Sequence, residues 1–123
     1  MTNKKIIFLT IDDDFISRKL VSSILKKFPG GTEIIEAENG KEALEILKRR
    51  DDVDLILLDM NMPVLNGESF LINLPEDTFI PIIVMTTDEK YKSIALDSGA
   101  AEFMVKPINP EILISKIQEY VGN

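Results

Sequence analysis

The 123-residue chain contains no cysteine and no histidine. Without thiols it can form neither disulfides nor thiolate metal sites. Without imidazole it cannot use histidine acid–base catalysis, a histidine–metal site or a Ser-His-Asp triad. Any chemistry must therefore use carboxylates, hydroxyls, lysines and backbone groups.

Long apolar runs are also missing. No segment reaches the roughly 20 apolar residues of a membrane span. The apolar run that stops at Asp12 is too short and too β-branched for a signal peptide. The net charge of −7 disfavours direct binding to nucleic acid or to an anionic membrane. These features predict a cytoplasmic protein with no membrane insertion and no direct nucleic-acid partner.

The length fits one domain over residues 1–123, since domains cluster at roughly 100–150 residues. Apolar runs alternate with amphipathic stretches. Strands are expected at 6–11, 33–37, 55–58, 80–85 and 102–105, and helices at 15–28, from 40, around 67–74, from about 88 to 98 and from 110 to about 121. Strands that are apolar on both faces indicate a central parallel sheet covered by helices. The predicted fold class is therefore α/β, a doubly wound (βα)5 sheet of the flavodoxin-like type.

Helical spacing also predicts which side chains face the core. In the first helix these are Ile16, Leu20, Val21, Ile24 and Leu25, and in the last they are Ile112, Leu113, Ile117 and Val121.

Polar residues follow the apolar strands at their carboxyl ends, where open α/β sheets bind their ligands. The first strand stops at Asp12-Asp13-Asp14, the third at Asp59, the fourth at Thr86 and the fifth at Lys106. Clustered carboxylates repel one another unless a cation neutralises them. An all-oxygen cluster selects a hard ion, Mg²⁺ or Mn²⁺. With a lysine and a hydroxyl beside it, such a cluster would stabilise in-line phosphoryl transfer onto a carboxylate.

Four motifs resemble the receiver domain of two-component response regulators. They are Ile-Asp-Asp-Asp (11–14), Leu-Leu-Asp-Met-Asn-Met-Pro (57–63) with Gly67, Met-Thr-Thr (85–87) and Val-Lys-Pro (105–107). They occur in the family's order and span the whole chain. Single-domain regulators of the chemotaxis or phosphorelay type are the most similar in architecture.

The resemblance implies a role for each matched residue. Asp59 is the implied phosphoacceptor. Asp12 and Asp13, with Asp59 and the backbone carbonyl of Asn61, would hold Mg²⁺. The remaining matches are Thr86 and Lys106 as phosphoryl contacts, Phe103 as a switch aromatic, and a cis peptide between Lys106 and Pro107.

The implied function is a phosphorylation-activated switch. A histidine kinase or histidine phosphotransfer protein would phosphorylate it, and it would pass the signal to another protein. It would be no enzyme beyond assisting its own phosphorylation and dephosphorylation. Thr87 and Phe103 depart from the family pattern, which has a small residue and more often a tyrosine there.

Other interpretations remain. A haloacid-dehalogenase-like phosphatase would need a second acid two residues past the nucleophile, where this chain has Asn61. A pseudo-receiver, which is never phosphorylated, usually lacks part of the acidic set that is intact here. A flavodoxin-like flavin binder would need a phosphate loop after the first strand. Asp14 is expected to cap the first helix, and Phe103 fits a core residue equally well.

Overall fold

The computed structural model describes residues 5–60, 62, 66–75 and 77–121. Asn61, predicted to supply a metal-binding carbonyl, lies outside these residues. Five parallel strands form one sheet in the order β2-β1-β3-β4-β5. The strands are β1 (Ile6–Ile11), β2 (Thr32–Ala37), β3 (Leu55–Leu58), β4 (Ile82–Thr86) and β5 (Glu102–Val105). This order confirms the predicted doubly wound, flavodoxin-like class.

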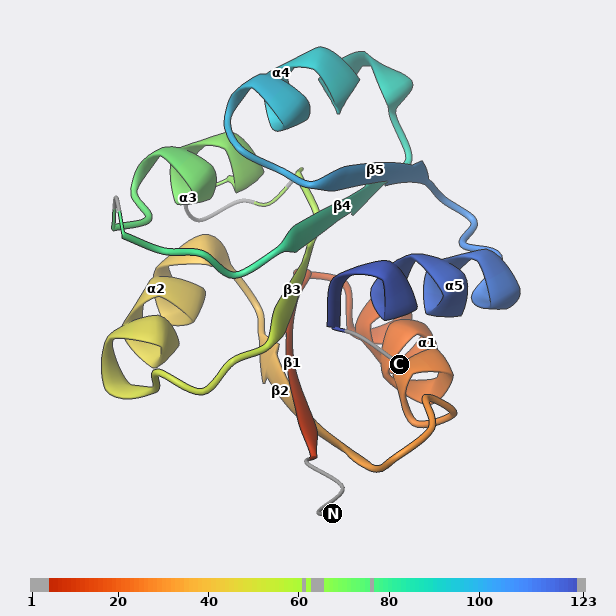
Figure 1. Cartoon of the computed structure of the whole chain (residues 1–123). Coiled ribbons are helices and arrows are strands. Elements are labelled where there is room, and N and C mark those ends of the chain that lie inside the picture. The colour runs from red at the N-terminus through yellow and green to blue at the C-terminus, as the bar shows by residue number, and fades with distance from the viewer. Residues whose placement is uncertain (1–4, 61, 63–65, 76, 122–123) are drawn as a thin grey trace.

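Helices cover both faces of the sheet (Figure 1). They are α1 (Phe15–Leu25), α2 (Gly40–Arg49), α3 (Gly67–Ile72), α4 (Lys92–Asp97) and α5 (Pro110–Val121), with a 3₁₀ turn, η1 (Glu89–Tyr91), before α4. The helices α1 and α5 lie on one face, and α2, α3 and α4 lie on the other. Each face buries its own hydrophobic cluster. No helix in the described part of the chain is long and apolar enough to cross a membrane.

Several elements differ in extent from their predicted ranges. The helix α3 ends at Ile72 instead of near residue 74, and β4 covers Ile82–Thr86 instead of 80–85. The first α-helix ends at Leu25, and the backbone N–H groups of Lys27 and Phe28 then donate to carbonyls only three residues back. In the segment predicted as one helix from about 88 to 98, the Asp88 carboxylate accepts from the Lys90 N–H at 3.0 Å. This N-cap begins a separate 3₁₀ turn before α4.

The predicted inner face of α1 is wrong in part. Ile16 and Leu20 are 68% and 63% exposed. The buried positions of this helix are Arg18, Val21, Ser22 and Leu25. The true inner face therefore follows the spacing i, i+3, i+4, i+7 but includes two polar residues, which a count of apolar residues passes over. Ile112, predicted to face the core from α5, is likewise half exposed.

Alternation along the strands assigns each side chain to one layer. In β4, Ile82 and Val84 belong to the cluster beneath α2, α3 and α4. Thr86 continues this alternation, so it faces the same layer. Phe103 of β5 packs against that cluster too, and it pairs with Val84, two residues before Thr86.

Candidate functional site

The site lies at the carboxyl edge of the two central strands. Strands β1 and β3 are neighbours, with Ile11 opposite Leu58, so the residues that follow them lie side by side. The Asp59 N–H donates to the Ile11 carbonyl at 2.9 Å. This register places Asp59 beside Asp12, although the two are 47 positions apart in sequence.

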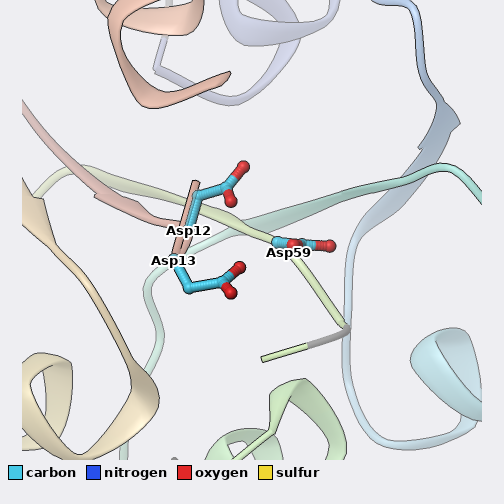
Figure 2. Close-up of side chains that lie close together, drawn as sticks. All are labelled: Asp12, Asp13 and Asp59. Carbon is cyan, nitrogen blue, oxygen red and sulfur yellow. The ribbon is translucent and has the colours of Figure 1, made fainter. Parts of the chain in front are cut away.

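Three carboxylates meet there (Figure 2). Each of Asp12, Asp13 and Asp59 offers one oxygen, and these oxygens lie within 4.8 Å of one another. Asp12 and Asp59 are buried, whereas Asp13 is exposed. Negative charges at this spacing repel, and burial strengthens the repulsion. The set is made of oxygen ligands alone, so it could hold a hard divalent cation.

Lys106 lies against one side of this cluster. Its Nζ donates to Asp12 Oδ2 and to Ser17 Oγ, each at 2.8 Å. Its backbone N–H donates to the Thr86 carbonyl at 2.8 Å, which joins the ends of β4 and β5. The Lys106–Pro107 peptide is cis, as the resemblance implies. The structure thus brings together the predicted lysine and the predicted acidic pair.

The backbone of Asp12 is held from the α1 side. Arg18, which is buried, donates to the Asp12 carbonyl at 2.8 Å and to Glu36 Oε1 at 3.0 Å. Hydrogen bonds from Lys19 and then from Arg18 lower the pKa of Glu36. Glu36 therefore stays ionised, and it anchors the arginine that fixes Asp12.

Asp14 caps the same helix, as predicted. Its carboxylate accepts from the Ser17 N–H at 2.7 Å. Its own N–H donates to Asp12 Oδ1 at 2.9 Å. Because Asp14 supplies the cap, Asp12 and Asp13 are left for the carboxylate cluster.

Thr86 ends β4 with its hydroxyl buried. The residue is 1% exposed, and its Oγ1 has no hydrogen-bond partner among the described residues. A buried hydroxyl without a partner is costly and rare, so one at a functional edge requires an explanation. The neighbouring Thr87 is exposed.

Phe103 is placed with the core instead of with the carboxylates. It is half-buried and packs against the cluster beneath α2, α3 and α4, as Tyr91 does. This placement agrees with a core role, and the proposed switch role of Phe103 stays a prediction.

Gly67 lets α3 start close against Met60, the residue that follows Asp59. Its N–H donates to the Met60 carbonyl at 3.0 Å. A Cβ at this position would lie 2.6 Å from Met60 Cα. No side chain fits there without moving the backbone next to Asp59.

Sequence reasoning missed Ser17, Arg18 and Glu36. The only signal for Arg18 was its position in a stripe with Val21 and Leu25. Glu36 comes from β2, and its role depends on the packing of β2 against α1. Nothing in the pattern around Ser17 indicates its contact with Lys106, 89 positions away.

Comparison with known proteins gives one consistent family. The family model "Response regulator receiver domain" matches residues 8–118. The chain is 32% identical over 119 residues to the chemotaxis protein CheY1 of Helicobacter pylori, covering 93% of this chain and 95% of that protein. It is 30% identical over 119 residues to a CheY homologue of Campylobacter jejuni, covering 93% and 91%.

Solved structures of similar proteins agree with this family assignment. Chemotaxis protein CheY4 of Vibrio cholerae superposes with a TM-score of 0.81 at 31% identity, over 95% of this chain and 99% of that one. The receiver domain of sensor histidine kinase PA1611 from Pseudomonas aeruginosa, a structure with a magnesium ion in its active-site cleft, superposes with a TM-score of 0.85 over 98% and 100%. At 23% identity, that second likeness shows the shared fold.

Proposed function

This chain belongs to the response-regulator receiver family and is a phosphorylation-activated switch of two-component signalling, and from that premise we propose that Asp59 is its phosphoacceptor. The observation that carries the proposal is that carboxylate oxygens of Asp12, Asp13 and Asp59 lie within 4.8 Å of one another. Residues 1–123 would form one receiver domain.

The same carboxylates fit a bound Mg²⁺ or Mn²⁺. Asp12, Asp13 and Asp59 supply hard oxygen ligands, and the carbonyl of Asn61 would complete the set. When bound, the ion would neutralise charge on the carboxylates and on the transferring phosphoryl oxygens. The magnesium ion in the active-site cleft of the PA1611 receiver domain agrees with this assignment.

Different residues of the chain would have different roles in phosphoryl transfer. A carboxylate oxygen of Asp59 attacks phosphorus in line, forming a P–O bond as the P–N bond to the donor histidine breaks. Lys106, held 2.8 Å from Asp12, is close enough to the cluster to pair with a phosphoryl oxygen. The Thr86 hydroxyl, which has no hydrogen-bond partner in the described part of the chain, would donate to the same group. Positioning and charge neutralisation account for most catalysis of this kind.

The chain is homologous to CheY, a signalling protein. We propose that its chemistry is limited to its own phosphorylation and dephosphorylation. Asn61 has no carboxylate to act as general acid or base for a second substrate.

Phosphorylation would act by shifting the population of two conformations. Thr86 would move toward the phosphoryl group. Phe103 lies on the same face of the sheet, against the strand that ends in Thr86, so its ring would respond. The output surface would then be α4, β5 and α5, read by a downstream protein.

The phosphodonor would be a histidine kinase or histidine phosphotransfer protein in the cytoplasm. Next to the acidic cluster, α1 exposes Phe15, Ile16 and Leu20 by 60%, 68% and 63%. An apolar surface beside a phosphorylation site suits a docking protein that must bring its phosphohistidine to Asp59.

The test is treatment with acetyl phosphate or phosphoramidate and Mg²⁺, followed by intact-mass measurement. We expect the wild type to gain one phosphoryl group and Asp59→Asn to gain none. If the wild-type mass stays unmodified and the protein shows no response to beryllofluoride, the chain would instead be a pseudo-receiver. Release of phosphate from many unrelated monoesters would indicate a phosphatase.

A further inference from the structure

We propose that Ser17 is a positioning residue for Lys106. Its hydroxyl holds the Lys106 ammonium on Asp12 in the unphosphorylated protein, so that Mg²⁺ must compete with Lys106 for that carboxylate. This inference rests on the metal site of the proposed function.

The geometry defines a three-membered contact. Lys106 Nζ donates at 2.8 Å both to Asp12 Oδ2 and to Ser17 Oγ. Of the three ammonium donors, these two contacts use two. The side chains of Lys106 and Asp12 are only 17% and 6% exposed, so water screens the contact weakly.

Ser17 is held in place independently of the lysine. Its backbone N–H is bound by the Asp14 cap at 2.7 Å. The next residue, Arg18, is fixed to the Asp12 carbonyl and to Glu36. The hydroxyl therefore projects from a helix start that these hydrogen bonds hold without help from Lys106.

A metal ion at Asp12 would place a second cation on the carboxylate that Lys106 already occupies. The two cations repel, and Asp12 Oδ1 already accepts from the Asp14 N–H. Lys106 would have to leave Oδ2, and its bond to Ser17 would break with that movement. An interaction present only in the metal-free state weakens metal binding by its own free energy.

The same hydroxyl opposes the movement of Lys106 toward a phosphoryl group on Asp59. Ser17 would thus stabilise the resting arrangement against both events. Loss of the hydroxyl should tighten Mg²⁺ binding and favour the arrangement stabilised by beryllofluoride.

The experiment is a calorimetric Mg²⁺ titration of the full chain and of Ser17→Ala. Alanine keeps the N–H bound by Asp14 and is a good helix former, so the fold should persist. We expect the Kd to fall about three- to tenfold, which corresponds to one ordinary hydrogen bond. Ser17→Thr, which keeps the hydroxyl, should restore the wild-type Kd. Ser23→Ala, at an exposed serine of the same helix, should leave the Kd unchanged.

A double-mutant cycle separates positioning from a general effect on α1. In a Lys106→Met background the Ser17→Ala substitution should no longer change the Kd, because no ammonium remains to be held. This inference alone would be overturned if Ser17→Ala lowered the Kd for Mg²⁺ equally with and without Lys106. It would also be overturned if the wild type and Ser17→Ala bound Mg²⁺ with equal affinity. A wild type that shows no saturable Mg²⁺ binding would overturn the proposed metal site and this inference with it.

Discussion

Two buried threonine hydroxyls, those of Thr86 and Thr10, have no hydrogen-bond partner among the described residues. Valine has nearly the same shape without the buried polar atom. We therefore expect Thr86→Val and Thr10→Val each to leave the free energy of unfolding unchanged or to raise it by up to about 1 kcal/mol, measured by urea denaturation.

The two variants should differ in function. Only Thr86→Val should lose the NMR response to beryllofluoride, because Thr86 lies at the carboxyl edge of β4 and Thr10 lies within β1. An equal loss in both would mean that the response does not depend on the Thr86 hydroxyl.

Gly67 leaves space for the backbone of Met60, the residue that follows Asp59. The added methyl group of Gly67→Ala would meet the Met60 backbone at 2.6 Å, which only a backbone shift can relieve. We expect a loss of about 1–3 kcal/mol in the free energy of unfolding. Urea denaturation measures it, with Glu68→Ala at the exposed neighbouring position as the control. Equal stability of the two variants would show that the Met60 backbone can shift at little cost in free energy.

At the scale of elements, α1 has an unusual division of its faces. Its inner face carries Arg18, which fixes Asp12, while Ile16 and Leu20 face outward. If the outward face docks the phosphodonor protein, Leu20→Glu should slow phosphorylation by that protein about fivefold or more, as expected for a residue contributing about 1 kcal/mol to an interface.

The matched control distinguishes docking from chemistry. Phosphorylation of Leu20→Glu by acetyl phosphate should proceed at the wild-type rate, because this small donor needs no docking surface. Ile72→Glu, on α3 and 68% exposed in the wild type, should slow neither reaction. Slowing with both donors would mean that the Leu20 substitution disturbs the site itself.

For the whole molecule, ion pairs and hydrogen bonds make stability depend on pH. Three glutamates have lowered pKa values, each chiefly because of a side-chain hydrogen bond. The partners are Arg50 for Glu33, Lys19 for Glu36 and Tyr120 for Glu102. Groups with lowered pKa values stabilise the fold above their unfolded pKa of 4.5 and lose this contribution as the pH falls through the folded values. Urea denaturation should therefore show stability decreasing below about pH 4.5.

At high pH, Tyr120 makes the free energy of unfolding decrease as the pH rises, which is the opposite direction to the glutamates. Its hydrogen bond to Glu102 raises its pKa from 10.0 to about 12. The stability that this provides is complete below pH 10 and is lost as the pH rises toward 12. Tyr120→Phe should make the free energy of unfolding less dependent on pH in this range. An unchanged alkaline slope would contradict the assignment.

The fold and most of the acidic site could be predicted because each depends on local patterns. Strands apolar on both faces indicate the sheet, and a polar residue at each strand end indicates the functional edge. The inner face of α1 could not be predicted, because the burial of Arg18 depends on Glu36 of another strand. The contact of Ser17 with Lys106 depends on the side chain of Lys106 reaching from the residue after β5 to the start of α1, which no local pattern encodes.

The strand order β2-β1-β3-β4-β5 also has a consequence for the newly made chain. All three clustered carboxylates come from the central pair β1 and β3, so they have been synthesised by residue 59, whereas Lys106 follows 47 positions later. Domains begin to fold from the N-terminal side during synthesis. A nascent chain that had assembled only its central strands would hold three repelling acids without the lysine and with β3 as an unpaired edge. On the ribosome, β4 would have to pair with β3 to cover that edge, and either Lys106 or a cation from the cell would be needed to neutralise the acids.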